Sequence, residues 1–334
     1  MQIAFLMDPP ESIDPQYETT AALMYEAYQR GHSVFFLEAH DIDVRRQQIA
    51  ARIKEIAVPA GLSLEAYWQA AIGREKEGPG NFKALTELDA IFLRKNPPLD
   101  CSAMELLALI GNQGFVLNDP RGMILASSKV YTLNFPELIP QTHISRDPSR
   151  LRSIIDSFDG DMVIKPPGRY GGQGIIRVSR RDPENLDALI NYYVGGHKPW
   201  AARNQIMLQE YLPAVKNKGD VRILLLNGEI LGAMGRKPAE DSFRTNICAG
   251  GKALPHTITA REREICEQIR PRLIADGLHF VGLDLIDERL IEINCVSPGG
   301  IVRINRLEGT HIEARVIDFI ETRGRTPKAA VSLL

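Results

Sequence analysis

Apolar runs alternate with longer amphipathic stretches along the first third of the chain. Apolar residues at helical spacing over 18–30 predict a helix that ends at Gly31, and a second helix is expected over 101–112. Short apolar runs typical of buried strands lie at 2–7, 34–39, 90–95 and 115–118. Apolar strands that alternate with helices predict a parallel sheet covered on both faces. We therefore expect an N-terminal α/β domain over residues 1–120.

The segment 40–87 is more polar than its surroundings, and its pattern is weaker. We expect one helix near 43–56. The rest of the segment carries no assignment.

A second unit is expected over 121–203, with helices at 127–135, 148–158 and 184–194. From residue 204 the pattern changes to short strands, which predicts a third unit over 204–334. In this third unit the Asn227-Gly228 pair is a strong signal for a hairpin turn. Two further helices are expected there, over 258–276 and 309–322, separated by two short strands.

Composition gives little support to several classes of protein. The chain has 334 residues, is 44% hydrophobic and 25% charged, and carries a formal net charge of −2. This balance gives no reason to expect a nucleic acid or a membrane as partner. No apolar run reaches the ~18 residues of a membrane span, and the opening MQIAFLMDPP is typical of a strand, not of a signal peptide. The 4 cysteines form no CxxC pair, so we expect neither disulfides nor structural zinc, and a cytoplasmic location.

A glycine-rich stretch at 161–178 is the first candidate for chemistry. Its glycines stand at positions 168, 171, 172 and 174. No glycine is followed by Lys-Ser or Lys-Thr, which excludes a Walker loop. The next residues, GIIRVSR, are typical of a strand, whereas a dinucleotide site needs a helix there. The pattern predicts a strand–glycine–strand hairpin that closes over phosphates, with Lys165 at the end of the first strand; an ordinary glycine-rich turn stays open.

A second candidate is the predicted hairpin GLDLIDERLIEIN over 282–294. With a three-residue turn over 287–289, Asp284 faces Glu292, and Asn294 lies on the same side. The opposite side carries Leu283, Leu285, Ile291 and Ile293, which we expect in a core. Opposed carboxylates repel each other unless a cation lies between them, and oxygen ligands suit Mg²⁺. The alternative is a solvated acidic face on an edge hairpin.

A third segment, 208–228, joins a strand to a polar loop. Residues 210–212 could offer main-chain groups to an adenine edge. Asp220 could bind a ribose hydroxyl and Arg222 an anion, although charged loop residues are usually only solvated.

Taken in order, the motifs resemble those of the ATP-grasp superfamily, and more closely those of the bacterial glutathione synthetases. The ordered set is Lys129, VIKPPGRYGGQG, LQEYLPAVK, GDVR, FRTNICAGG, FVGLDLI and EINCVSP, and MDPP and FLRKNPP extend it into the N-terminal unit. The resemblance implies three parts: the N-terminal α/β domain, a central lid domain and a C-terminal ATP-grasp domain. ATP would lie between the last two.

The resemblance also implies a role for each candidate residue. Contacts to ATP fall to Lys129, Lys165, Gly171, Gly172, Gly174, Gln209, Glu210, Tyr211, Leu212 and Asp220. Asp284, Glu292 and Asn294 would be the ligands of magnesium, bound as two ions that Mn²⁺ can replace. Arg222 and Arg236 would act at the acyl phosphate. Ser297, Gly299 and Gly300 would line the glycine end.

Arg94 and Lys95 end an apolar strand, where ligands of α/β sheets gather. By the resemblance they would hold the carboxylates of γ-glutamylcysteine, and arginine can bind a carboxylate through two parallel hydrogen bonds. A solvated pair at a strand end is the alternative.

The implied activity is that of a glutathione synthase, an ATP-dependent ligase that joins γ-glutamylcysteine to glycine and forms a homo-oligomer such as a homotetramer. No side-chain nucleophile is needed, and we interpret the 7 scattered histidines as structural. The sequence departs from the family at Asn96, over 237–251 and over 301–309. A paralogous ligase with another acid or amine therefore stays open, as does a non-catalytic nucleotide-binding regulator. The sequence lacks the HRD and DFG motifs of the protein kinases, which argues against a kinase-like phosphotransferase.

Overall fold

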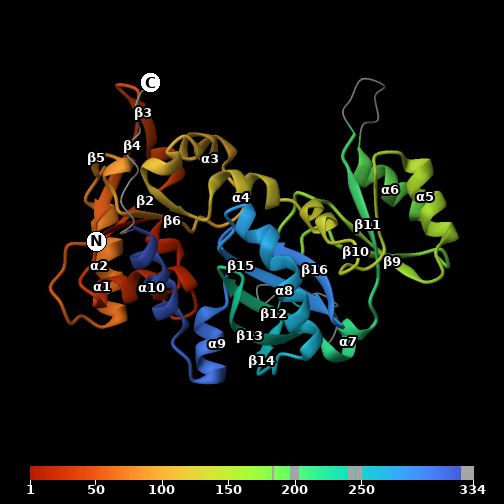
Figure 1. Ribbon diagram of the computed structural model, residues 1–334. Coiled ribbons are helices and arrows are strands. Elements are labelled where there is room, and N and C mark those ends of the chain that lie inside the picture. The colour runs from red at the N-terminus through yellow and green to blue at the C-terminus, as the bar shows by residue number, and fades with distance from the viewer. Residues whose placement is uncertain (183, 196–202, 240–244, 246–249, 325–334) are drawn as a thin grey trace.

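The computed structural model describes residues 1–182, 184–195, 203–239, 245 and 250–324, and Figure 1 shows how its elements are arranged. Three sheets organise these residues. Parts of the 237–251 segment, Cys248 and residues 325–334 lie outside the description. No described helix is long and apolar enough to cross a membrane.

The first sheet has a parallel centre, as the alternation predicted. Its parallel strands are β1 (Gln2–Leu6), β2 (Ser33–Leu37), β6 (Ala90–Leu93) and β7 (Phe115–Leu117). The helices of this part are α1 (Thr19–Gln29), α2 (Leu64–Lys76) and α3 (Cys101–Ala108). The last described helix, α10 (Ile312–Gly324), packs against α1, and Arg30 pairs with Asp318 across that contact at 2.6 Å.

The helix expected near 43–56 is wrong. The segment forms an antiparallel hairpin of β3 (Ile42–Arg45) and β4 (Gln48–Glu55), and β5 (Asn81–Ala84) adds to β4. Arg46 and Gln47 make the turn with φ of 49° and 63°. Glycine and asparagine are the usual residues in that conformation, so the sequence carried no turn signal here.

The second sheet is antiparallel and contains the strand–glycine–strand hairpin. Its order is β10 (Ile176–Ser179), β9 (Asp161–Lys165), β11 (Ile206–Glu210) and β8 (Thr142–Ser145). Helices α5 (Pro148–Ser157) and α6 (Leu186–Val194) cover one face, where Met162 and Ile164 are buried. Because side chains alternate along a strand, Val163 and Lys165 point to the other face, toward the third sheet.

The third sheet has the order β14 (Lys252–Leu254), β13 (Glu229–Lys237), β12 (Asp220–Leu226), β15 (Phe280–Ile286) and β16 (Arg289–Asn294). Its helices are α7 (Ala214–Lys218), α8 (Ala260–Ala275) and α9 (Ile301–Glu308). In the chain, α4 (Pro120–Ala126) and a 3-10 helix (Lys129–Asn134) follow the first sheet and precede the second. The 3-10 helix takes the place of the helix expected over 127–135. Other 3-10 helices are Pro10–Ser12, Ala39–Asp41, Leu85–Glu87 and Gly111–Gln113.

The β15–β16 hairpin turns over two residues, not the three expected. Asp287 and Glu288 form the turn with φ of 49° and 61°. A register shift after Asp284 then restores the predicted pairing of Asp284 with Glu292. The shift also changes which side chain is in the core: Leu290 is fully buried, whereas Ile291, which we expected there, borders a pocket.

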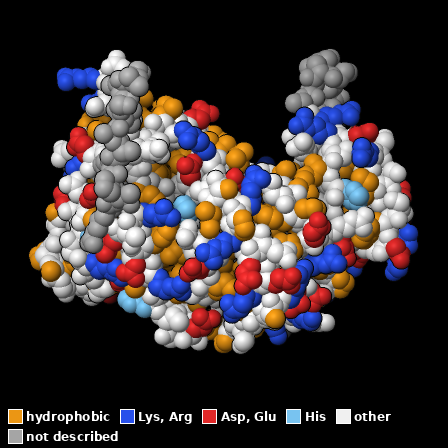
Figure 2. Space-filling model, viewed as in Figure 1, with side chains coloured by type: hydrophobic (Ala, Val, Ile, Leu, Met, Phe, Trp, Pro, Cys, Tyr) orange, Lys and Arg blue, Asp and Glu red, His pale blue; other side chains and the backbone are white. Residues whose placement is uncertain are grey.

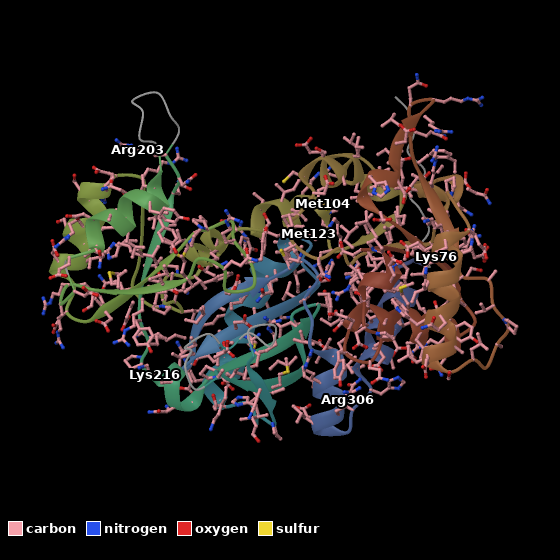
Figure 3. The ribbon with its side chains drawn as sticks, turned by 180° about the vertical axis from the view of Figure 1, so that it is seen from behind. Lys76, Met104, Met123, Arg203, Lys216 and Arg306 are labelled. Carbon is pink, nitrogen blue, oxygen red and sulfur yellow. The ribbon has the colours of Figure 1, made fainter. Side chains whose placement is uncertain are left out.

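Buried apolar side chains join the parts of the molecule. Met104 of α3 and Met123 of α4 are both buried, in the strip that links the first sheet to the others (Figure 3). On the face drawn in Figure 2, the molecule is hollowed between the lobe of the first sheet and that of the second, and basic and acidic side chains are interspersed.

Candidate active site

A first pocket lies between the second and third sheets. The predicted residues that line it are Lys129, Lys165, Gln209, Glu210, Tyr211, Leu212, Asp220, Arg236, Asp284 and Glu292. One part of its wall is apolar, with Val163, Val215 and Ile286 beside Tyr211. A flat apolar ring fits against such a wall, and the polar part suits a charged chain attached to the ring.

Two of the three amides of the 210–212 segment are already used. The Glu210 and Tyr211 amides already donate to the carbonyls of Gln141 and Asp161 at 2.8 and 3.0 Å. The Leu212 amide has no partner among the described residues and is thus the N–H of this segment that a ring could use.

Lys165 is buried at the polar part of the first pocket. Burial lowers the pKa of Lys165 to about 8, against the attraction of Glu292 and Asp284. Its Nζ lies 2.5 Å from Oε1 of Gln209, and Gln209 Nε2 donates to Thr142 Oγ1 at 2.9 Å. Gln209 therefore holds the ammonium in place, a role that its position before the 210–212 segment did not indicate.

Lys129 connects the glycine loop to β16. Its Nζ lies 3.1 Å from Oε1 of Glu292 and also donates to the Arg169 carbonyl. Its backbone N–H donates to the Pro167 carbonyl at 3.2 Å. The residue thus fixes one end of the loop above the carboxylates.

The glycine loop needs its glycines for their backbone conformation. Gly171, Gly172 and Gly174 have φ of 60°, 75° and 70°, in the left-handed region that other residues adopt at a cost. Gly168 has no such angle, and a Cβ there would meet nothing within 4 Å. The loop conformation therefore depends on the last three glycines and not on the first.

Two arginines neutralise Asp284. Arg222 donates to it through Nε and Nη2, at 2.5 and 2.9 Å, and Arg236 Nη2 lies 2.9 Å from its Oδ1. Burial by itself would raise the pKa of Asp284, but the two guanidinium groups hold that pKa well below its usual range. The carboxylate therefore stays ionised even though it is buried.

Asp220 lies on the other side of Arg236. Arg236 donates to both carboxylate oxygens of Asp220, at 2.8 and 2.5 Å, and Thr245 Oγ1 donates to Oδ2 at 2.5 Å. Burial raises the pKa of Asp220 despite Arg236. In this arrangement the side chain is committed to Arg236 and Thr245, and a ribose contact would need Thr245 to move.

The residues on β15 and β16 fit a hard divalent cation. Asp284, Glu292 and Asn294 project from one side of the hairpin, and Asn294 Nδ2 lies 3.2 Å from Asp284 Oδ2. One oxygen of Glu292 pairs with Lys129, and its other oxygen has no partner among the described residues. Carboxylate and amide oxygens are the donors that Mg²⁺ prefers.

A second pocket adjoins the first. Lys129, Arg236 and Glu292 line both pockets. Arg222 also lines the second pocket. The rest of its wall includes Tyr17, Glu18, Asn96 and Pro97 from the first sheet's side, residues 126–128, Tyr170 and Gly171 of the glycine loop, Met234, residues 293–300 and Arg303. The two pockets thus meet at two cations and one carboxylate.

The loop 297–300 forms part of the second pocket and is held from both sides. Arg222 Nη1 donates to the Gly299 carbonyl at 3.2 Å, and Thr19 Oγ1 accepts from the Gly300 amide at 3.1 Å. Ser297 has a φ of 48°, and its hydroxyl donates to the Arg94 carbonyl at 2.9 Å.

Arg94 lies behind this loop and not on the pocket wall. The residue is 1% exposed, and it donates to Thr20 Oγ1 at 3.2 Å and to the Pro298 carbonyl at 3.1 Å. Burial lowers the pKa of Arg94 to about 10. Lys95 pairs with Asp8 at 3.0 Å. This geometry argues against a direct carboxylate clamp and gives Arg94 the role of positioning the loop.

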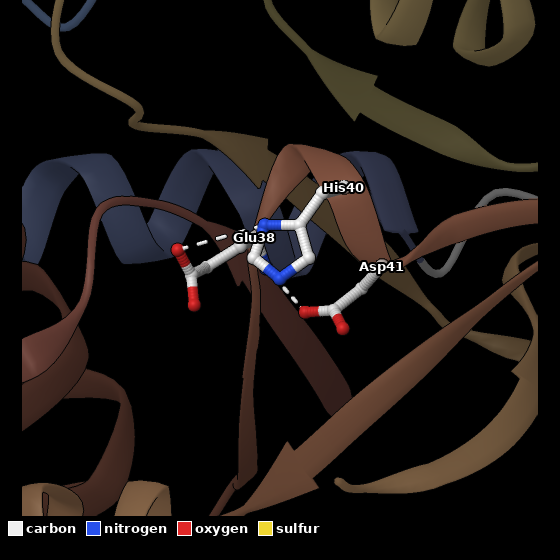
Figure 4. Close-up of side chains that lie close together, drawn as sticks. All are labelled: Glu38, His40 and Asp41. Atoms are coloured by element: carbon white, nitrogen blue, oxygen red, sulfur yellow. Dashed lines mark hydrogen bonds and ion pairs between the residues drawn. The ribbon is translucent and has the colours of Figure 1, made fainter.

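A separate cluster of metal-binding side chain types lies far from these residues in the chain. Glu38, His40 and Asp41 have ligand atoms within 4.8 Å of one another (Figure 4). Asp41 caps its own turn by accepting from the Glu38 amide at 2.9 Å, and Arg45 and Arg52 border the same hollow. The cluster is thus explained by local turn geometry, and the positive charges of the two arginines disfavour binding of a cation there.

The class comes first, and it is a class of fold, the ATP-grasp fold. The ATP-grasp ligase PsnB, solved in complex with a minimal precursor, matches with a TM-score of 0.62 over 96% of this chain and 98% of that chain. At 15% identity this likeness shows the fold alone.

Two family models then specify the family. The N-terminal domain of prokaryotic glutathione synthetase matches residues 1–123, and its ATP-grasp domain matches residues 128–309. A glutathione synthetase of Synechocystis sp. is 37% identical, over 96% of this chain and 99% of that protein. One of Gloeobacter violaceus is 38% identical, over 96% of each. The chain belongs to the prokaryotic glutathione synthetase family, so the resemblance read from the motifs is confirmed.

Membership of this family brings the use of ATP, dependence on a divalent metal and small-molecule substrates.

The sequence did not single out Glu18, Arg303, Tyr170 or Thr245 as site residues, although all four line the pockets. Tyr170 and Thr245 lie inside two of the motifs that carried the resemblance, so their place in the chain was the available signal. Glu18 and Arg303 are ordinary surface residues by their local pattern, and only the packing of distant segments brings them to the site.

Proposed function

We propose that this protein is a glutathione synthase, an ATP-dependent ligase that joins γ-glutamylcysteine to glycine and releases ADP and phosphate. The observation that carries the proposal is the junction of two pockets at Lys129, Arg236 and Glu292. ATP occupies the first pocket, with its ring near Tyr211 and its phosphates toward Lys165. The acid substrate occupies the second pocket, and its reacting carboxylate lies at the junction.

The reaction follows from charge. A carboxylate is a poor electrophile, so one of its oxygens attacks the γ-phosphorus of ATP, and the bond from that phosphorus to ADP breaks. The glycine nitrogen then attacks the acyl carbon, phosphate leaves, and the nitrogen loses a proton. Lys129, Lys165 and Arg236 offset the charge on the transferring phosphoryl group. Arg222 orients the carbonyl of Gly299 at the glycine end.

Asp284, Glu292 and Asn294 would hold the divalent metal, which we propose to be Mg²⁺ as two ions, replaceable by Mn²⁺. When bound, the metal neutralises phosphate charge and aligns the triphosphate. Arg222 and Arg236 already compensate Asp284, which leaves Glu292 as the carboxylate with an oxygen open to the metal.

We propose three domains: residues 1–120 bind the acid substrate, residues 121–203 form the lid, and residues 204–334 form the catalytic domain. The free thiols of Cys101, Cys266 and Cys295 agree with a reducing, cytoplasmic setting. A homo-oligomer such as a homotetramer stays a prediction, which light scattering on the purified protein tests.

One alternative keeps the ligase and changes its substrate. Two of the positions that we interpreted as departures from the family, Asn96 and the segment that contains Arg303, border the second pocket, where the acid would bind. A paralogue with another acid would therefore retain the first pocket unchanged. A regulator that binds nucleotide without turnover would not need the polar junction between the pockets.

ADP release against a panel of acid and amine pairs tests the proposal. We expect release with γ-glutamylcysteine and glycine together, and much less when either is omitted. Release with a different acid would keep the ligase and discard glutathione synthesis. ATP binding without release in any combination would leave the regulator.

A further inference from the structure

The charged side chains of the second pocket fall into two groups. Four of them are paired within the protein: Lys129 and Glu292 with each other, and Arg222 and Arg236 with Asp284. The other two, Glu18 and Arg303, have no ion-pair partner among the described residues.

Glu18 is the residue before the first turn of α1, but its side chain does not cap the helix. The two hydroxyls that follow it are used elsewhere: Thr19 accepts from the backbone of the 300–301 segment, and Thr20 accepts from Arg94. The half-buried Glu18 carboxylate attracts the buried Arg94 guanidinium, but it borders the pocket with no side-chain hydrogen bond or ion pair among the described residues. Such a carboxylate is available to a ligand cation.

Arg303 lies in the first turn of α9, on the same pocket. Its guanidinium carbon is 5.6 Å from the ring centre of Tyr17, the neighbour of Glu18 in the chain. An aromatic face braces a guanidinium without using its N–H donors. The fork of donors is therefore free to bind a carboxylate through two hydrogen bonds.

We infer that Arg303 and Glu18 form the recognition site for the amino-acid end of the acid substrate, with Arg303 binding its α-carboxylate and Glu18 its α-ammonium. The inference rests on the proposed function and deepens it. A γ-glutamyl group carries both charges on one carbon, remote from the carboxylate that reacts. Glycine carries both charges too, but its nitrogen must reach the acyl carbon at the junction, which neither Glu18 nor Arg303 lines.

Arg303 also lies in the 301–309 segment, which we interpreted from the motifs as a departure from the family. A residue that contacts the non-reacting end of the acid can change which acid is accepted without touching phosphoryl transfer. The pair therefore sets acid specificity, separately from the chemistry at Lys129, Arg236 and Glu292.

The test compares Arg303→Ala with Arg306→Ala in the full-length protein. Arg306, labelled in Figure 3, lies on the same helix, 4.9 Å from the same Tyr17 ring, and donates to the Gln16 carbonyl, but it does not line the pocket. Loss of a charge-assisted hydrogen bond should raise the KM for γ-glutamylcysteine about 10- to 100-fold in Arg303→Ala. The KM values for ATP and glycine should change little, and Arg306→Ala should match the unmodified protein.

Substrate analogues assign the two contacts. Glutaryl-cysteine lacks the ammonium, so Glu18→Gln should no longer matter with it. 4-Aminobutyryl-cysteine lacks the carboxylate, so Arg303→Ala should no longer matter with that one. This cycle isolates each pair of partners.

Several results would overturn the inference. A rise in the KM for glycine in place of the acid would put Arg303 at the amine site. Equal effects of Arg303→Ala and Arg306→Ala would reduce Arg303 to a surface charge. If the panel identifies another acid, the same variants are measured with that acid. In that case glutathione synthesis is wrong, whatever the variants show. The inference about Arg303 is wrong only if Arg303→Ala leaves the KM for that acid unchanged.

Discussion

Burial lowers the pKa of Lys165 from 10.5 to about 8. In the ATP-free protein, about half of the Lys165 side chains are therefore in the charged ammonium form at about pH 8. Triphosphate binding brings several negative charges to the ammonium and must raise that pKa again. The sign follows: the protein takes up a proton when the nucleotide binds, and affinity falls as the pH rises through the ATP-free pKa.

The magnitude follows from the same value. Near pH 8 the uptake should be about half a proton per site, and near pH 9 only about one site in ten is charged beforehand. Nucleotide affinity should then be about 10-fold weaker near pH 9 than near pH 7, which corresponds to about 1.4 kcal/mol.

Titration calorimetry measures the uptake directly. A non-hydrolysable ATP analogue with Mg²⁺ is titrated in two buffers of different ionisation enthalpy across this pH range. Lys165→Arg is the matched control, because arginine stays charged throughout and should show neither the uptake nor the pH dependence. Equal uptake in Lys165→Arg, or an affinity that does not change with pH, would refute this account of Lys165.

Three further predictions test other parts of the site. Glu292→Gln should lower turnover at limiting Mg²⁺ by about 10- to 100-fold, while Glu288→Gln on the same hairpin should not; equal turnover in the two would remove Glu292 from the metal site. Gly171→Ala should lower ATP affinity or turnover with little change in Tm, because φ is 60° there, while Gly168→Ala should change neither. Equal ATP affinity and turnover in the two variants would make the loop an ordinary turn. Arg94→Met should lower stability by about 1–3 kcal/mol and raise the KM for the acid but not for ATP; an unchanged Tm with a raised KM would restore the direct clamp.

Local pattern predicted the parallel strands of the first sheet and the strand–glycine–strand hairpin, because burial on one or both faces leaves a clear period in the sequence. The pairing of Asp284 with Glu292 was also confirmed. It was reached through a wrong turn length, and a register shift after Asp284 made up the difference. A turn of two non-glycine residues at positive φ leaves little trace in composition.

Long-range packing could not be predicted in the same way. Arg94 looked like a ligand group because it ends a strand, but the loop that it supports lies 203 residues away in the chain. Asp284 looked like an uncompensated carboxylate, but Arg222 is its cross-strand neighbour on β12. Which cation meets which carboxylate depends on strand order, and strand order is a property of the whole fold.

The central claim is that a substrate carboxylate attacks ATP at the junction of the two pockets. Its most direct test uses γ-glutamylcysteine labelled with ¹⁸O in the cysteinyl carboxylate, together with glycine and ATP. If an acyl phosphate forms, one carboxylate oxygen leaves with each phosphate, and mass spectrometry should find one ¹⁸O atom in every phosphate released. Turnover that yields unlabelled phosphate would contradict the account.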